Sequence, residues 1–298
     1  MTIEILRKGL GGTVYRASLL PVRYGISPDR IVSRLVRMIA MMARWDSRPT
    51  IPITASVLER HPEILRSLRD ADLAVHGYRH ISYEDLPFDE KRSDLDAACT
   101  VFSNLGLLLR GFRAPYLRAD RETLDLVRSR GFLFDSSSTQ LALPAGHPIT
   151  RAVRLLIATR YGTDSVVPSV AMHPTLVEMP VSLPDDEILV DGLGLRNTTG
   201  LWHAFEAMME IASSTGSHLI LQVHPERFHI CEAALELLIE RAVDTGGWLT
   251  PLSEASDWIV GSPGSSRRWP DGHSFALSIT GDLDAASIGD FASRIWGK

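Results

Sequence analysis

The sequence predicts an α/β fold built from parallel strands with helices packed outside them. Short apolar runs alternate along most of the chain with longer segments whose apolar residues recur at helical spacing. This alternation favours a parallel sheet, because a helix must carry the chain back before each new parallel strand begins. The sequence shows no internal repeat and no second hydrophobic core, so we expect a single domain over residues 1–298.

Boundary signals place the individual elements. Ser27 is a good N-cap residue with Pro28 at the first helical position, and Gly106 and Gly131 are typical residues at helix ends. Helices are expected over residues 28–45, 61–71, 88–105, 120–130, 201–214, 228–245 and 285–296, and strands over residues 50–54, 71–75, 107–112, 132–135, 176–181, 218–223, 248–249 and 275–279. The remaining long stretches are expected to be loops at the mouth of the fold (residues 136–175), a linker (residues 261–273) and an N-terminal extension without an assigned role (residues 1–49).

The composition argues against several classes of protein. The chain has 45% hydrophobic and 22% charged residues and a net charge of −5, so it offers no basic surface for nucleic acid or for an anionic membrane. Arginines interrupt the most apolar helix candidate, residues 31–45, which therefore should not span a membrane. The first residues do not resemble a secretory signal, so a cytoplasmic location is expected. Cys99 and Cys231 are expected to be free, buried thiols.

His76 and His80 stand four residues apart, directly after a short apolar strand. Two imidazoles at this spacing can face one point if the strand leads into a helical turn. A neutral imidazole is a common ligand of divalent metals. The chain has ten histidines, and such a pair also occurs without any metal, so the interpretation depends on the other polar clusters.

Three further clusters stand at the ends of predicted strands: Arg113 with Tyr116, then His224, and finally Asp282 with Asp284. Taken singly, each has a simpler interpretation as a surface cation, a hydrogen-bonded surface histidine, or acidic residues at a helix N-terminus. Together with the histidine pair they offer metal ligands, a second carboxylate, an arginine and a third histidine. An α/β barrel keeps its active site at the carboxyl ends of its strands, so the set indicates a metal-dependent hydrolase.

These clusters resemble motifs of a known family. Residues 76–80 (HGYRH), 112–116 (FRAPY) and 221–224 (LQVH) are similar to the second, third and fifth motifs of the polysaccharide deacetylases. This is the NodB-homology superfamily, which includes the family 4 carbohydrate esterases. Its first motif normally precedes the others, whereas the matching residues here are 276–285 (ALSITGDLDA), near the C-terminus.

The resemblance covers roughly residues 50–298 and implies a NodB-like fold, a single distorted (β/α)7-type barrel. The displaced motif implies a circular permutation, in which residues 274–298 supply the first strand and its helix. We expect the strand at residues 275–279 to pair between strands from the N-terminal half of the chain.

The resemblance also implies one divalent metal ion held by Asp284, His76 and His80. Zn²⁺ is the first expectation, with Co²⁺, Ni²⁺ and Mn²⁺ as alternatives. A metal with three protein ligands keeps open positions for other groups, as a catalytic site requires.

The same resemblance assigns the catalytic roles. Asp282 is the general base, and Arg113 holds and orients it. His224 is the general acid that protonates the departing amine. The backbone N–H of Tyr116 contributes to the oxyanion site.

The fourth family motif, a tryptophan-bearing segment whose aspartate tunes the acid histidine, is not evident. Asp135 lies in the corresponding region and is a candidate, with a structural aspartate at the start of a turn as an equal alternative. Residues 177–186 (VEMPVSLPDD) resemble the mouth strand of some family members, and no role is assigned to them.

Three functions are compatible with these residues. The first is a metal-dependent hydrolase that removes an N-acyl group, most often acetyl, from an amino sugar or glycan. The second is a hydrolase of a small cyclic amide or ureide on the same fold, and the third is a non-catalytic sugar-binding protein. The expected partner is thus an N-acylated sugar or a small amide, with no nucleic acid, and a homo-oligomer is left open.

Overall fold

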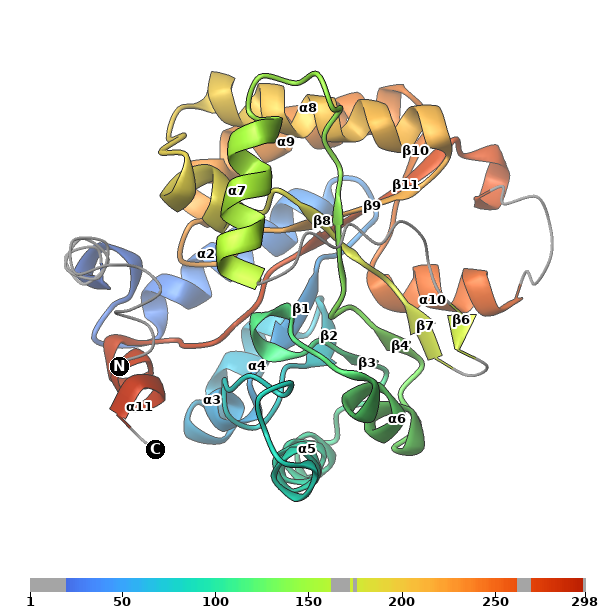
Figure 1. The fold of residues 1–298 in the computed structure, drawn as a ribbon. Coiled ribbons are helices and arrows are strands. Elements are labelled where there is room, and N and C mark those ends of the chain that lie inside the picture. Colours follow the sequence, from blue (N-terminus) through green and yellow to red (C-terminus); the bar gives the residue numbers. More distant parts are fainter. Residues whose placement is uncertain (1–19, 162–171, 174–175, 262–268, 297–298) are drawn as a thin grey trace.

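In the computed structural model, short strands form a curled, mostly parallel sheet with helices over its outer face (Figure 1). The structure describes residues 20–161, 172–173, 176–261 and 269–296. The architecture is a distorted half-barrel of β/α units, which confirms the predicted fold class. None of the helices in these described ranges is long and apolar enough to cross a lipid bilayer.

The main sheet contains nine strands. They are β1 (Thr50–Ile53), β2 (Asp72–Val75), β3 (Gly111–Phe112), β4 (Phe134–Asp135), β6 (Met172–His173), β7 (Leu176–Glu178), β9 (His218–Gln222), β10 (Gly247–Leu249) and β11 (Phe275–Thr280). Their order is β10–β11–β1–β2–β3–β4–β7–β6, and β9 also pairs with β11. Every pairing is parallel except that of β6 with β7. A separate parallel pair joins β5 (Thr139–Leu141) to β8 (Val181–Leu183).

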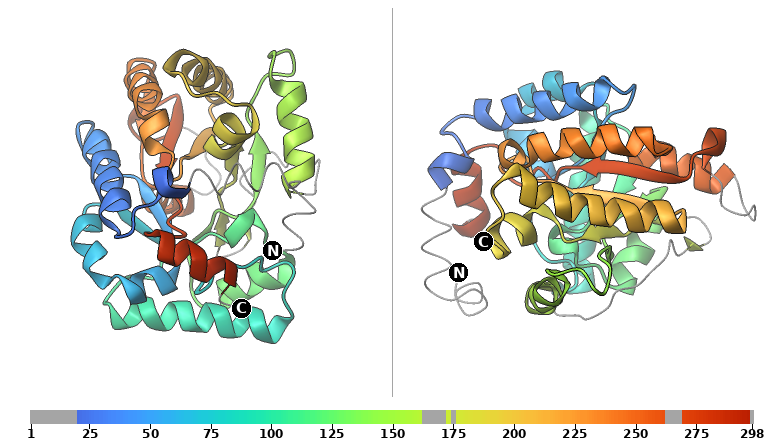
Figure 2. Two further views of the ribbon diagram at one scale, coloured as in Figure 1. Left: turned by 90° about the vertical axis from the view of Figure 1, so that its left-hand side faces the viewer. Right: turned by 90° about the horizontal axis from the view of Figure 1, so that it is seen from above.

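Helices cover the convex side of the sheet. They are α2 (Asp29–Ala43), α3 (Ala55–Arg60), α4 (Leu65–Leu68), α5 (Phe88–Asn104), α6 (Arg121–Ser129), α8 (Thr198–Thr215) and α9 (Phe228–Asp244). Successive members of this layer pack against one another, α6 on α5, α5 on α3, α2 on α9 and α9 on α8. Figure 2 shows α2, α9 and α8 side by side above the sheet, whereas α7 (Thr150–Tyr161), α10 (Leu252–Gly261) and α11 (Ile288–Trp296) lie apart from them.

The last strand of the chain, β11, lies inside the sheet. One side pairs with β9 along residues 276–280, and the other side pairs with β10 and, at Thr280, with Thr50 of β1. The predicted insertion is therefore confirmed, but only β1 comes from the N-terminal half. The prediction of two N-terminal neighbours is wrong because β9 carries the polar partners of β11. In β9, His218 Nε2 lies 2.8 Å from the Ser278 hydroxyl of β11. Gln222, also in β9, donates a hydrogen bond to Asp282, which follows β11.

Two groups of buried apolar side chains hold the layers together. The larger group joins the outer helices to the sheet, and α2 alone contributes six buried apolar residues along one side. The smaller group lies on the opposite face, where β2, β4, β7, β9 and α10 meet, and its members include Ala74, Phe134, Val177, Ile220 and Leu252. Because both faces are covered, β9 and β11 are buried along their whole length, as parallel strands usually are.

Several predicted elements need correction. The helix expected over residues 61–71 is replaced by a 3₁₀ turn (Pro62–Ile64) and the short α4, and α3 before it was not predicted, because Pro62 separates the two helices. The loops expected over residues 136–175 contain β5 and α7, and α10 was not anticipated. Most of the predicted linker falls in residues 262–268, outside the described residues.

Candidate metal and catalytic site

The structure brings four separate sequence clusters together at the carboxyl ends of the strands. His76 and His80 follow β2, Arg113 follows β3, His224 follows β9, and the pair Asp282 and Asp284 follows β11. The sheet pairing continues past the end of β11, because Leu283 N donates to Pro52 O and Thr54 N donates to Leu283 O. This extension fixes the backbone on both sides of Leu283. Both carboxylates then face His76, as their two-residue spacing predicts.

The histidine pair is presented by a bend, so the predicted helical turn after β2 is wrong. Gly77 has a φ of +73°, and a Cβ there would lie 3.0 Å from Arg79 O and 3.2 Å from the Tyr83 ring. A glycine is therefore needed to turn the chain at this point. The buried Asp94 carboxylate then ties the bend together, since it accepts hydrogen bonds from Tyr78 N and the Tyr83 hydroxyl.

The three predicted metal ligands form a compact donor set. One donor atom from each of His76, His80 and Asp284 lies within 4.8 Å of the other two. His76 Nε2 is 3.3 Å from Asp284 Oδ1, and His80 Nε2 is 3.1 Å from Asp284 Oδ2. His76 donates its Nδ1 proton to Arg113 O at 2.7 Å, which orients the ring so that Nε2 faces the carboxylate.

These residues fit a divalent metal. His76 Nε2 and Asp284 Oδ1 are both buried without a hydrogen-bond partner among the described residues. A buried polar atom without a partner is costly, and a metal ion between two such atoms would remove that cost. Two imidazole nitrogens and one carboxylate also make a familiar donor set for Zn²⁺.

The ionisation states suit metal binding. Burial keeps the pKa of His80 well below 6.5, so its ring is neutral at pH 7 despite the nearby Asp284 carboxylate. Burial alone would raise the pKa of Asp284, but His80, His76 and Arg294 together hold that pKa well below its usual range. The site therefore combines neutral imidazole with an ionised carboxylate.

Asp282 lies beside the three ligands and is held by two donors. Arg113 Nη1 donates to Asp282 Oδ1 at 2.7 Å, and Gln222 Nε2 donates to Asp282 Oδ2 at 2.8 Å. Arg113 is fully buried and is itself fixed by Ser136, whose hydroxyl and carbonyl oxygens accept from Nη2 and Nε. Asp282 Oδ2 is 3.7 Å from His76 Nε2, so this carboxylate adjoins the metal ligands.

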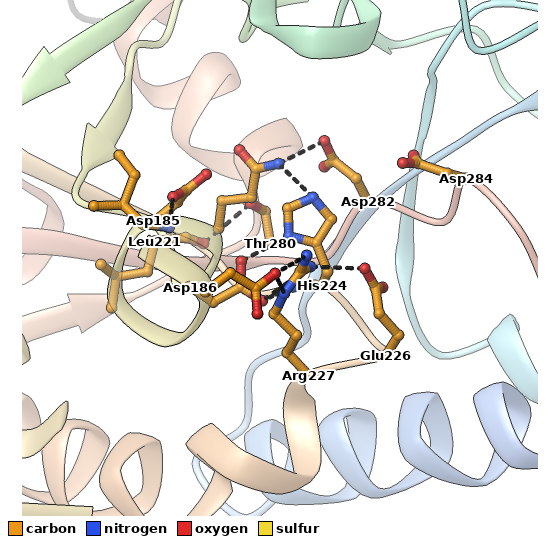
Figure 3. A network of polar contacts seen from close by, with 12 residues as sticks. Asp185, Asp186, Leu221, His224, Glu226, Arg227, Thr280, Asp282 and Asp284 are labelled. Atoms are coloured by element: carbon orange, nitrogen blue, oxygen red, sulfur yellow. Dashed lines mark hydrogen bonds and ion pairs between the residues drawn. The ribbon is translucent and has the colours of Figure 1, made fainter. Parts of the chain in front are cut away.

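His224 is paired with Asp186, a residue that the sequence did not single out (Figure 3). His224 Nδ1 donates to Asp186 Oδ1 at 2.6 Å, and His224 N donates to Asp186 Oδ2 at 2.8 Å. Burial lowers the pKa of His224, but the Asp186 carboxylate, and after it Glu226, outweigh burial and raise this pKa well above 6.5. The side chain is therefore protonated at neutral pH, as a general acid must be.

Asp135, the sequence candidate for this role, points elsewhere. Its carboxylate accepts from Ser137 N at 2.9 Å and from the Ser137 hydroxyl at 2.7 Å. Burial, and after it the Glu178 carboxyl group, raises the pKa of Asp135 well above its usual range. The aspartate next to His224 is thus Asp186, in the segment that resembles the mouth strand. Asp135 instead stabilises the turn that begins after β4, which was the alternative interpretation of this residue.

Tyr116 lies on the other side of the histidine pair. It has a φ of +62° inside the 3₁₀ turn Pro115–Leu117, and its ring meets the His80 ring edge-on with centroids 4.3 Å apart. This places Tyr116 next to a metal ligand. The predicted role of its backbone N–H in an oxyanion site stays a prediction.

Two further residues in the site were missed by the sequence analysis. Gln222 is buried and lies between the predicted base and acid, with Nε2 2.8 Å from Asp282 Oδ2 and 3.2 Å from His224 Nε2. Arg294 of α11 donates from Nη1 to Asp284 Oδ2 at 2.8 Å. Gln222 stands inside the quoted LQVH segment, so its position was a usable signal, whereas nothing in the local sequence marks Arg294.

Comparisons with known proteins show similarity in sequence to a curated protein and in fold to solved structures. No family model matches the chain. The peptidoglycan deacetylase-like protein FGM2 of Gibberella zeae is 32% identical over 127 residues, which cover 41% of this chain. The chain spans only about a third (35%) of the length of that relative.

Solved structures share the fold. A protein from Mycobacterium smegmatis described as a polysaccharide deacetylase superposes with a TM-score of 0.62 at 23% identity, covering 82% of each chain. The allantoinase Puue superposes with a TM-score of 0.51 at 21% identity, covering 72% of this chain and 68% of the other.

Proposed function

We propose that this chain is a member of the NodB-homology superfamily of the polysaccharide deacetylases and a metal-dependent hydrolase of carbon–nitrogen bonds. The substrate class that we propose is an amino sugar or glycan carrying an N-acyl group, with acetyl as the first choice. The metal that we propose is one divalent ion, with Zn²⁺ as the first choice, held by His76, His80 and Asp284.

One observation carries the proposal. The buried Asp282 carboxylate lies between Arg113 and the metal ligands, and Gln222 lies between this carboxylate and the protonated His224. A carboxylate that can accept a proton and a protonated histidine that can donate one thus lie close together, a pattern characteristic of acid–base catalysis. Ordinary surface ion pairs would not explain why Asp282 and His224 are buried beside three metal-ligand candidates that have buried polar atoms without hydrogen-bond partners among the described residues.

The residues divide the work as follows. A divalent metal bound at His76, His80 and Asp284 would act as a Lewis acid toward the amide carbonyl oxygen. Asp282 removes a proton from the attacking water, and Arg113 holds and orients this carboxylate. His224 delivers its proton to the amine nitrogen when the carbon–nitrogen bond breaks, since an unprotonated amide nitrogen is a poor leaving group.

The test is a hydrolysis assay with metal-reconstituted protein. N-Acetylglucosamine, short N-acetylated oligosaccharides and peptidoglycan fragments would be offered, and released acetate and free amine would be quantified. Release that depends on added Zn²⁺ and disappears in Asp282→Asn supports the proposal. Binding of these sugars by metal-loaded protein without any release would support the sugar-binding alternative and overturn the proposed activity.

A second candidate function rests on Gln222. Its Oε1 atom is buried and has no hydrogen-bond partner among the described residues, while Nε2 is committed to Asp282. An N–H group of a small cyclic amide or ureide would satisfy this acceptor, and the shared fold includes an allantoinase. Chromatography can measure the ring opening of hydantoin and related cyclic ureides in parallel with the acetate assay. The substrate that is hydrolysed distinguishes cyclic-amide hydrolysis from N-deacetylation.

A further inference from the structure

The side chain of Arg294, in α11, bonds to Asp284, one of the three proposed metal ligands. Its Nη1 atom donates to Asp284 Oδ2 at 2.8 Å. The other oxygen, Oδ1, faces His76 Nε2 at 3.3 Å and has no hydrogen-bond partner in the described part of the chain. The two oxygens of this carboxylate therefore have different surroundings.

Arg294 is itself held in place by packing. Its guanidinium lies over the Phe291 ring, with Cζ 5.4 Å from the ring centroid, and the Phe291 ring packs on the buried Tyr24 at 5.5 Å. The segment that carries Tyr24 is fastened to the start of α11, because Ile288 N donates to Gly25 O at 2.9 Å. An arginine ordered by an aromatic face loses less side-chain freedom when it binds a carboxylate.

We infer that Arg294 is a positioning residue that fixes how Asp284 binds the metal, an inference that rests on the proposed metal site. The guanidinium holds Oδ2, so that Oδ1 is the oxygen offered together with His76 Nε2. Hydrogen bonds to a ligating carboxylate commonly orient it, and their loss typically costs about 10- to 100-fold in metal affinity. The segment around Tyr24 then has a role as well, because Tyr24 packs against the Phe291 ring that Arg294 contacts.

A metal titration without substrate tests the inference. The purified chain is stripped of metal, and Zn²⁺ affinity is measured by competition with a chromophoric chelator for wild type, Arg294→Gln and Arg294→Lys. Arg294→Gln should bind Zn²⁺ about 10- to 100-fold more weakly than wild type. Arg294→Lys should have an intermediate affinity, because lysine keeps the positive charge but lacks the planar guanidinium that directs its N–H groups. The Co²⁺ absorption spectrum should change in Arg294→Gln, because Asp284 becomes free to use both oxygens.

Arg60, at the end of α3, offers a matched control because it too contacts α11. Its Nε atom donates to Asp290 Oδ1 at 2.7 Å, so Arg60→Gln removes an arginine–aspartate contact of α11 that touches no metal ligand. Zn²⁺ affinity and the Co²⁺ spectrum should be unchanged in Arg60→Gln. Circular dichroism would check folding, and if Arg294→Gln is unfolded, the intermediate affinity of Arg294→Lys carries the test.

The possible results distinguish failure of the positioning role of Arg294 from failure of the proposed hydrolase activity. Wild-type affinity in Arg294→Gln, tighter binding in it, or an equal loss in Arg60→Gln would each overturn the inference, as would the absence of Zn²⁺ binding by wild type. The expected affinities together with no hydrolysis of any amide would leave the positioning role intact and remove only the proposed activity.

Discussion

Replacing Asp186 by asparagine removes the carboxylate that lies 2.6 Å from His224 Nδ1 while keeping nearly the same volume. Burial lowers the pKa of His224, and Asp186 is the main group that raises it well above 6.5. An opposite charge at this range typically changes a pKa by about 1–3 units. In Asp186→Asn the pKa of His224 should therefore fall by that amount.

The sign of the effect on activity follows from the acid role. His224 must be protonated to donate, so kcat/KM is maintained below its pKa and falls as the pH rises through it. The alkaline limb of the pH profile should move about 1–3 units toward acid in Asp186→Asn. At a pH above both values, the rate should drop about 10- to 10³-fold, because each unit reduces the protonated fraction tenfold.

The assay is kcat/KM against pH, with an NMR titration of the His224 ring as an independent readout. Asp185→Asn is the matched control, since Asp185 accepts from Ile188 N at 2.8 Å and an asparagine can keep that bond. Its profile should stay like that of wild type. An alkaline limb that does not move in Asp186→Asn, or that moves equally in both variants, would refute the assignment of His224 as an acid tuned by Asp186.

Three further predictions concern the metal, the base and the core. Asp284→Ala or His80→Ala should lose the metal and nearly all activity, and full occupancy by elemental analysis in either variant would contradict this ligand set. Asp282→Asn should retain the metal yet lose about 10²- to 10⁴-fold in kcat, whereas loss of metal there with retention in Asp284→Asn would mean that the two roles are reversed. Gly111→Ala should lower the free energy of unfolding by about 1–3 kcal/mol, since its Cβ would lie 1.9 Å from the Phe134 ring. Urea denaturation measures this loss, and an unchanged midpoint would show that the ring can move aside.

The alternation of strands and helices was predictable because each element carries its own periodicity and end signals. The predicted site residues share a local property too, since each follows a strand and parallel strands end at one edge of a sheet. That is why His76, Arg113, His224 and Asp282 could be expected to meet before their contacts were known.

The residues that were missed owe their places to tertiary contacts. Asp185 and Asp186 are identical neighbours in the sequence, yet one accepts from Ile188 N and the other enters the site to meet His224. The conformation of the turn that carries these two residues determines which of them reaches His224. Arg294 likewise reaches Asp284 because α11 folds back over the strand end, and helical periodicity within α11 does not reveal this return.

The central position of β11 also constrains how the chain can fold. Thr280 pairs with Thr50, so the sheet joins the two ends of the described chain, and β1 and β9 each lack this neighbour until β11 arrives. Contacts between residues so distant in sequence close late and slowly, because the entropy of the intervening loop must be lost first. Until then, the backbone groups on those strand edges remain open to pairing with other chains. The strand that brings Asp282 and Asp284 into the candidate site should therefore also be the one whose docking protects the unfinished sheet from aggregation.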